Sequence, residues 1–255
     1  MLRIINFYKF IRLESLEDIR LAIREEAHRL NLRGTVLLAP EGINCGLYGT
    51  VDSLERFLTW IRSDCRFSDV QPKWSDARTP PYDGLQVKIK NWIIRFADDE
   101  PLSLNSIHKG GRLAPEEFRQ ILRDRRDDVV VIDTRNVYET DYGSFEGAEV
   151  LDLTRFTEFR SKFLERFGDR RDKTYVMYCT GGVRCEKSVA WAEQHGFRAF
   201  QLDGGILGYF EKCGQEGYQG QCFVFDNRWL LDAERAEVDD PGYGPRRQPK
   251  PRPLQ

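Results

Sequence analysis

The feature that most constrains this chain is the run of residues 175–185, which reads YVMYCTGGVRC. Its apolar start predicts a buried strand that stops at Cys179, and the spacing after Arg184 predicts a helix that closes at Gly196. A strand, a glycine loop and a helix start together direct backbone N–H groups and the positive end of the helix at the sulfur, which favours the thiolate. We therefore predict that Cys179 is a nucleophile, with an inert buried thiol at a strand end as the alternative.

Two further apolar runs, one earlier and one later in the chain, also predict strands. Residues 129–132, VVVI, end at Asp133 and Arg135, and residues 199–202 end in an Asp-Gly-Gly turn. Strands that alternate with helices predict a parallel sheet flanked by helices, with right-handed crossovers. Such sheets bind ligands at the carboxyl ends of their strands, so Asp133 and Arg135 are site candidates. A surface loop with a local ion pair is the alternative.

The N-terminal part of the chain predicts a different architecture. Apolar runs and helical spacings over residues 2–96 follow the order strand, helix, strand, strand, helix, strand, with the last strands expected at 70–74 and 85–96. That order predicts an α+β ferredoxin-like, or acylphosphatase-like, sandwich. The run PEGIN at residues 40–44 predicts a tight hairpin, with Glu41 and Asn44 as alternative site residues.

These patterns divide the chain into four segments. We predict a ferredoxin-like domain at 1–97, a linker at 98–113 that is polar and contains Gly110 and Gly111, and an α/β domain at 114–238. Residues 239–255 are rich in proline and arginine, which predicts a disordered tail.

Composition excludes several classes of protein. The 255 residues carry a formal net charge of −2, so any nucleic-acid surface must be local. No apolar run is long enough to span a membrane, and the six scattered cysteines do not suggest a disulfide framework, so we expect a cytoplasmic protein. Cys213 and Cys222 are too far apart to make a zinc site, and no other metal-ligand cluster occurs. A nucleotide-binding glycine motif is also absent from the sequence. We therefore expect no tightly bound metal or cofactor.

The length of the cysteine loop limits its chemistry. Cysteine phosphatases need five residues between cysteine and arginine to surround a phosphoryl group, whereas four residues separate Cys179 from Arg184. The loop therefore predicts chemistry on sulfur or on another non-phosphoryl group, and the residues alone do not choose between these.

Residues 129–209 resemble a rhodanese domain in the stretches VVVIDTR, GSFEGA, VMYCTGGVRC and QLDGGI. More narrowly, the chain resembles the tRNA uridine hydroxylase family in FYKF, LLAPEGIN, VVVIDTRN, MYCTGGVRCEKS, QLDGGI and CFVFD, over about residues 7–226. The resemblance implies a two-domain cytoplasmic enzyme that oxygenates the wobble uridine of tRNA at carbon 5, with molecular oxygen as co-substrate, to give 5-hydroxyuridine.

The resemblance also implies the site. Cys179 matches the active cysteine of the family, which by analogy with rhodaneses forms a persulfide-type intermediate. The matching loop residues are Thr180, Gly181, Gly182, Val183, Arg184 and Cys185. Within that loop, Cys185 is either a resolving thiol for an oxidised Cys179 or a packing residue. Arg184 would orient a phosphate or an anionic intermediate, and Asp133 and Arg135 would face the same pocket.

Two other functions stay open at the level of sequence. A thiosulfate-type sulfurtransferase would use Cys179 as a persulfide, and a binding module would not need this cysteine at all. If tRNA is the partner, its phosphates require a local basic surface, which we expect at the junction of the domains. The candidates are Lys9, Arg33, Lys88 and Lys90 of the first domain, with Arg135 and Arg184 of the second.

Overall fold

The N-terminal domain is a five-stranded sheet with two helices on one face. The computed structural model describes residues 2–96 and 102–238. The elements of this domain are β1 (Leu2–Phe10), α1 (Leu16–Arg29), β2 (Arg33–Ala39), β3 (Gly42–Thr50), α2 (Val51–Arg62), η1 (Cys65–Phe67), β4 (Lys73–Asp76) and β5 (Leu85–Ile89). The strand order β4-β1-β3-β2-β5 confirms the ferredoxin-like sandwich, to which β5 adds an edge strand parallel to β2.

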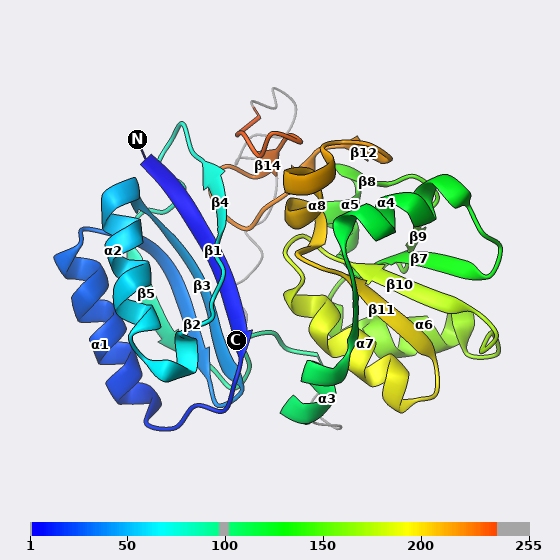
Figure 1. The fold of residues 1–255 in the computed structure, drawn as a ribbon, viewed down its shortest axis with the longest axis horizontal. Helices are drawn as coiled ribbons and strands as arrows, with labels where there is room; N and C mark the ends of the chain where they lie inside the picture. Colours follow the sequence, from blue (N-terminus) through cyan, green and yellow to red (C-terminus); the bar gives the residue numbers. More distant parts are fainter. Residues whose placement is uncertain (1, 97–101, 239–255) are drawn as a thin grey trace.

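Helical periodicity explains how α2 covers this sheet. Leu54, Phe57, Leu58 and Ile61 recur at helical spacing and are all buried. The side chain of Thr50 caps the helix by accepting a hydrogen bond from the backbone N–H of Ser53 at 3.1 Å. Helix α1 buries its apolar stripe on the same face, so the opposite face of the sheet is left for the second domain (Figure 1).

The C-terminal domain contains a parallel five-stranded sheet, as predicted. Its strand order is β6-β11-β10-β7-β9, and every neighbouring pair is parallel. The elements are α3 (Leu104–Lys109), β6 (Gly111–Leu113), α4 (Pro115–Asp124), β7 (Val129–Asp133), α5 (Val137–Thr140), β8 (Gly143–Phe145), β9 (Glu149–Val150), η2 (Phe156–Glu158), α6 (Phe159–Phe167), β10 (Thr174–Tyr178), α7 (Val183–Gln194), β11 (Arg198–Leu202), α8 (Gly205–Cys213), β12 (Tyr218–Gly220), β13 (Cys222–Phe223) and β14 (Leu230–Leu231). One apolar cluster joins the sheet to α6 and α7, and another joins it to α4 and α8.

The predicted linker, residues 98–113, differs from what the structure contains. Its described part forms helix α3 and strand β6, and β6 pairs with β11 as an edge of the second sheet. The interpretation as a linker rested on polarity and two glycines. Gly111 is nevertheless needed in the strand, because a Cβ atom there would lie 2.5 Å from the ring of Phe200.

The strand predicted to continue to Phe96 ends earlier, because the chain crosses to the other domain. Strand β5 stops at Ile89, and the ring of Phe96 packs 5.3 Å from that of Phe156 and 6.4 Å from that of Trp191. Strand β4 begins at Lys73, whereas the sequence predicted a strand from Val70.

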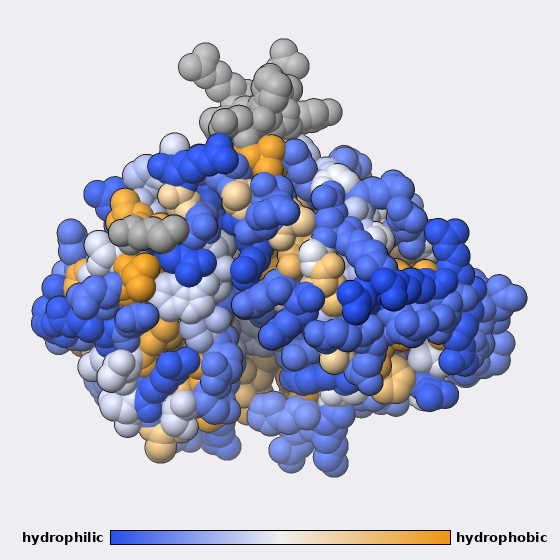
Figure 2. Space-filling view, turned by 45° about the horizontal axis from the view of Figure 1, so that its top comes forward, coloured by the Kyte–Doolittle hydropathy of each residue, from blue (hydrophilic) through white to orange (hydrophobic). Residues whose placement is uncertain are grey.

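The two domains share an apolar contact between the open face of the first sheet and helices α3 and α7. Its buried members come from both domains: Phe10, Ala39, Ile93, Ile107 and Ala190. Figure 1 shows α3 and α7 at this junction, and Figure 2 shows that hydrophilic residues cover most of one outer face. The predicted tail at 239–255 lies outside the described residues. Among the described helices, none is both long and apolar enough to cross a membrane.

Candidate active site

The cysteine loop has the predicted geometry of strand, loop and helix. Strand β10 ends at Tyr178, Cys179 follows, and α7 begins at Val183. Gly182 precedes the helix with a φ of 101°, a backbone conformation that favours glycine. Its N–H donates a hydrogen bond to the Cys179 sulfur at 3.1 Å. The sulfur is thus held by the start of the helix.

The surroundings of Cys179 stabilise its charged form. Burial by itself raises the pKa of a thiol, since the charged sulfur loses its water. Hydrogen bonds from the Cys185 thiol and from the N–H groups of Gly182 and Arg184, with the positive charge of Arg184, outweigh burial and lower the pKa of Cys179 to about 5. Burial and the hydrogen bond to Cys179 hold the pKa of Cys185 well above its ordinary value. These contacts therefore favour the thiolate of Cys179 and the neutral form of Cys185.

Cys185 is placed by the end of the neighbouring strand. The hydroxyl of Thr134 donates to the carbonyl oxygen of Tyr178 at 2.9 Å and lies 3.5 Å from the Cys185 sulfur. Cys185 is fully buried, which gives it a packing position as well as the role of donor. Its action as a resolving thiol stays a prediction.

A second glycine turn, at the start of α8, holds the cysteine loop through two backbone hydrogen bonds. The N–H of Ile206 donates to the carbonyl of Cys179 at 3.0 Å, and that of Leu207 donates to the carbonyl of Thr180 at 3.1 Å. Between them and the loop, Gly205 has a φ of 62°, and a Cβ atom there would lie 2.4 Å from the Cys179 oxygen. This contact explains the QLDGGI motif, to which sequence reasoning had assigned only a strand end.

Arg184 has a partner that the sequence did not indicate. Its guanidinium forms a paired ion bridge with Glu139 of α5, with N–O distances of 2.6 and 2.7 Å. Both side chains are buried, and the Glu139 carboxylate raises the pKa of Arg184 although burial lowers it. The arginine that we expected to orient an anionic group is thus fixed by a carboxylate, while its backbone N–H and its charge still act on Cys179.

Asp133 and Arg135 do not face an open pocket, which corrects our expectation. Both side chains are 0% exposed and form an ion pair with an N–O distance of 2.7 Å. Arg135 also donates to the carbonyl of Gly143. The position of the two residues at the carboxyl end of a strand had indicated a ligand site. Instead, the segment after β7 encloses the pair, and Arg135 holds that segment in place through the Gly143 carbonyl.

The N-terminal domain contributes residues that the sequence analysis missed. The hydroxyl of Tyr8 donates to the Glu186 carboxylate at 2.7 Å. Arg112 of β6, in the second domain, donates to both oxygens of the same carboxylate at 2.8 Å. The ammonium of Lys73 donates to the carbonyl of Gly181 at 2.8 Å. The FYKF stretch, which contains Tyr8, was the available signal, since it belonged to the family resemblance.

The PEGIN stretch joins the domains. Glu41 lies in the turn between β2 and β3, as predicted, and its carboxylate accepts hydrogen bonds from Lys187 of α7 at 2.7 and 2.9 Å. Lys187 also donates to the carbonyl of Ile94 at 2.8 Å. Asn44 lies within β3. The EKS stretch after Cys185 thus supplies two charges to the domain interface, through Glu186 and Lys187.

A groove of about 710 Å³ runs between the domains beside the cysteine loop. Tyr8 and Lys73 both line it, and both contact the loop, whereas Cys179 itself is only 1% exposed. Of the six basic residues expected at the junction, Lys9 lines the groove and forms an ion pair with Asp69. Arg135 and Arg184 are buried in their ion pairs, and the other three are not among the residues that line the groove: Arg33, Lys88 and Lys90.

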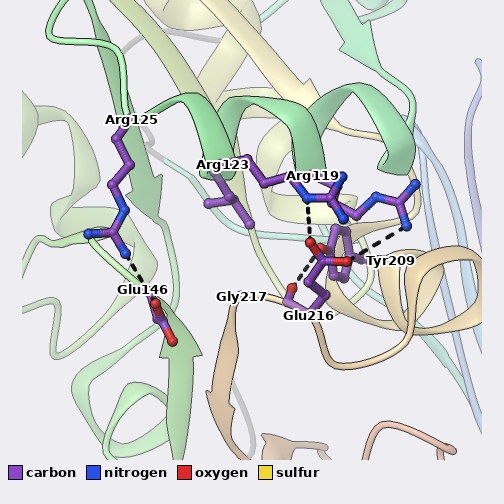
Figure 3. A pocket seen from close by; sticks show the side chains of 8 residues that line it. Arg119, Arg123, Arg125, Glu146, Tyr209, Glu216 and Gly217 are labelled. Carbon is purple, nitrogen blue, oxygen red and sulfur yellow. Dashed lines mark hydrogen bonds and ion pairs between the residues drawn. The ribbon is translucent and has the colours of Figure 1, made fainter.

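A smaller pocket of about 280 Å³ lies on helix α4, apart from Cys179 (Figure 3). Its arginines are neutralised locally. Arg119 and Arg123 reach Glu216, and Arg125 reaches Glu146. In the described part of the chain, no group of three or more His, Cys, Asp or Glu side chains could hold a metal ion.

Two domain families match the chain. Residues 2–93 match the UPF0176 acylphosphatase like domain, and residues 114–212 match the Rhodanese-like domain. The two matches correspond to the two sheets of the structure.

Similar proteins cover nearly the whole chain. A tRNA uridine(34) hydroxylase of Bordetella petrii is 43% identical over 230 residues, which are 88% of this chain and 90% of the relative. The protein of that name from Xanthomonas euvesicatoria pv. vesicatoria is 39% identical over 238 residues, covering 91% and 95%. That of Bordetella pertussis is 41% identical over 234 residues, covering 90% and 95%. The similarity therefore includes both domains.

Proposed function

Because the chain belongs to the tRNA uridine(34) hydroxylase family, we propose that it hydroxylates uridine 34 of tRNA at carbon 5 to give 5-hydroxyuridine. The observation that carries the proposal is the stabilised thiolate of Cys179 in a chain that matches this family across both domains. We place the reaction in the cytoplasm, where tRNA and reduced thiols are found.

Molecular oxygen is the proposed oxidant. The C5–H bond of the base becomes C5–OH with one atom of dioxygen, and the other atom leaves as water. The balance takes two electrons and two protons from a separate reductant.

The thiolate has two possible roles in this chemistry. Addition of the Cys179 sulfur to carbon 6 of the pyrimidine makes carbon 5 electron-rich, so that it reacts with oxygen, and elimination then releases the sulfur. A persulfide on the same sulfur is the rival intermediate. Both roles require the sulfur to be charged, which the hydrogen bonds from Gly182 and Cys185 favour.

We propose that the anticodon loop enters by the groove between the domains. A base must leave its stack before a protein group can react with its ring, and aromatic side chains stack on such bases. Tyr8 lines the groove at the cysteine loop, and Lys9, which also lines it, exchanges its exposed partner Asp69 for a phosphate of the RNA. Because Cys179 is buried, the groups that cover it have to shift before the base reaches the sulfur.

The test uses the purified full chain, unmodified tRNA, a reductant and isotopically labelled dioxygen, followed by nucleoside mass spectrometry. We expect labelled 5-hydroxyuridine at position 34 and none with Cys179→Ser, provided that this variant unfolds at the same temperature as the unchanged protein. Full activity in Cys179→Ser would contradict the mechanism.

The rhodanese-like match supports a second candidate, a thiosulfate sulfurtransferase. The same preparation incubated with thiosulfate and cyanide distinguishes the two. Thiocyanate formed without any change in the tRNA, or sulfur found in the nucleoside, would favour the sulfurtransferase.

A further inference from the structure

A single peptide unit connects the N-terminal domain to the Cys179 sulfur. The carbonyl of Gly181 accepts a hydrogen bond from the Lys73 ammonium at 2.8 Å, and the next N–H, that of Gly182, donates to the sulfur at 3.1 Å. These two groups belong to the same peptide plane. Because the peptide is planar and trans, its C=O and N–H point in opposite directions. A donor that fixes the carbonyl on one side therefore fixes the N–H on the other.

The lysine also strengthens the bond that it positions. A cation at the carbonyl oxygen polarises the amide, so its N–H becomes a better donor, and hydrogen bonds in such chains reinforce one another. Lys73 is the first residue of strand β4. Its side chain crosses the interface and donates its hydrogen bond to a loop of the other domain.

Tyr8 holds the same peptide from a second side. A Cβ atom at Gly182 would lie 2.8 Å from the Tyr8 hydroxyl, so the tyrosine is in close contact with this glycine. Two strands of the first domain, β1 and β4, thus bring a side chain to two successive residues of the cysteine loop.

We propose that Lys73 is a positioning residue, which holds the Gly181–Gly182 peptide with its N–H aimed at Cys179, so that the thiolate depends on the N-terminal domain. The inference does not depend on the reaction that the thiolate performs. Its matching prediction is that loss of Lys73 changes the ionisation of a sulfur in the other domain.

Other charged groups surround these two and remain in place in the test. The groups that face Lys73 are Tyr8 of β1, Glu186 of α7, Asp203 after β11, Glu211 of α8 and Cys179 itself. The groups that face Cys179, apart from Lys73 and Tyr8, are Arg184 and Cys185 of α7 and Cys222 of β13.

The experiment follows the ultraviolet absorbance of the thiolate against pH in the full chain, with the Cys179→Ser spectrum of the same background subtracted. Lys73→Met removes the donor, so its midpoint should move above about pH 5. At a pH below the midpoint of the unchanged protein, the variant should contain threefold to about tenfold less thiolate than that protein. The total absorbance change should stay the same, since the thiol still ionises at higher pH. A role in stability alone would leave the midpoint unchanged.

Two controls decide the interpretation. Lys73→Arg keeps the charge and the donors, so its midpoint should lie close to that of the unchanged protein. Lys212→Met removes an exposed charge from α8 that lines the same groove, and its midpoint should not move.

Three outcomes would overturn the proposal. They are an unchanged midpoint in Lys73→Met, a midpoint in Lys73→Arg displaced as far as in Lys73→Met, or an equal displacement in Lys212→Met. If Lys73→Met does not fold, Lys73→Gln takes its place, and an unchanged midpoint in Lys73→Gln would overturn the proposal in the same way.

Discussion

Cys179 shows how far single residues determine the site. The sequence correctly indicated an N–H donor at its sulfur, which is that of Gly182, because a glycine loop at a helix start provides such donors whatever the rest of the chain does. It could not indicate Glu139 as the partner of Arg184, since 45 residues separate them along the chain and only the tertiary fold brings them together. Nor could it indicate that Asp133 and Arg135 are enclosed, because burial is a property of the chain that covers them.

The first prediction at this scale concerns the pH dependence of the Cys179 thiolate. Donors to the sulfur stabilise the charged form, so the thiolate should be present above about pH 5 and lost below it. A free cysteine would instead titrate near pH 8.5. The absorbance difference between the protein and Cys179→Ser measures the midpoint directly. A midpoint near that of a free cysteine would show that the donors of the cysteine loop do not act on the sulfur.

At the scale of elements, the cysteine loop depends on the turn between β11 and α8. In Gly205→Ala, the added Cβ atom would meet the Cys179 oxygen at 2.4 Å and the Thr180 oxygen at 2.9 Å. Both are backbone atoms and cannot move aside, so we expect a loss of about 1–3 kcal/mol in the free energy of unfolding, together with a displaced thiolate midpoint. Thermal unfolding and the absorbance titration measure the two effects.

Gly147→Ala is the matched control for this substitution. Gly147 has a φ of 74°, similar to the 62° of Gly205, but nothing lies within 4 Å of its added Cβ. It therefore carries the cost of the backbone conformation without the clash. Equal effects of the two substitutions on both measurements would contradict a specific role of the β11–α8 turn.

Most elements could be predicted because their periodicity is local. The continuous apolar runs of β7 and β10 and the helical spacing of α2 gave the two fold classes. Strand β6 could not be predicted, since three residues carry no periodicity and their strand conformation comes from pairing with β11. The predicted linker therefore contains the first strand of the second sheet, and the chain leaves the first sheet earlier, after Ile89.

At the scale of the whole molecule, ion pairs between the domains decide how firmly they are joined. The side chains of Lys187 and Glu41 are 5% and 12% exposed. Lys187→Met leaves the carboxylate buried without its cation, which typically costs about 3–5 kcal/mol. The double variant with Glu41→Gln should recover part of this loss, because the uncompensated charge is then also removed. Chemical unfolding of the four proteins gives the coupling energy.

An exposed ion pair provides the comparison. Lys162 and Glu165 of α6 are 42% and 72% exposed, and such a pair is worth less than about 1 kcal/mol. If Lys187→Met were no more costly than Lys162→Met, the pair between the domains would not be a determinant of their association.

The proposed entry of tRNA by the groove between the domains predicts how binding responds to salt. The net charge of −2 provides no general attraction for a polyanion, so affinity must come from a few phosphate contacts at the groove. Each such contact releases counterions and adds about −0.7 to the slope of log affinity against log salt for single-stranded RNA. Lys9→Gln, at the edge of the groove, should therefore reduce the slope by about 0.7 and weaken binding to different tRNAs to a similar extent. Lys162→Gln changes the same charge on α6, on the side of the second domain away from the groove, and should leave the slope unchanged (Figure 1). Fluorescence anisotropy of labelled tRNA over a salt series measures both, and equal slopes for the two variants would place the RNA elsewhere on the molecule.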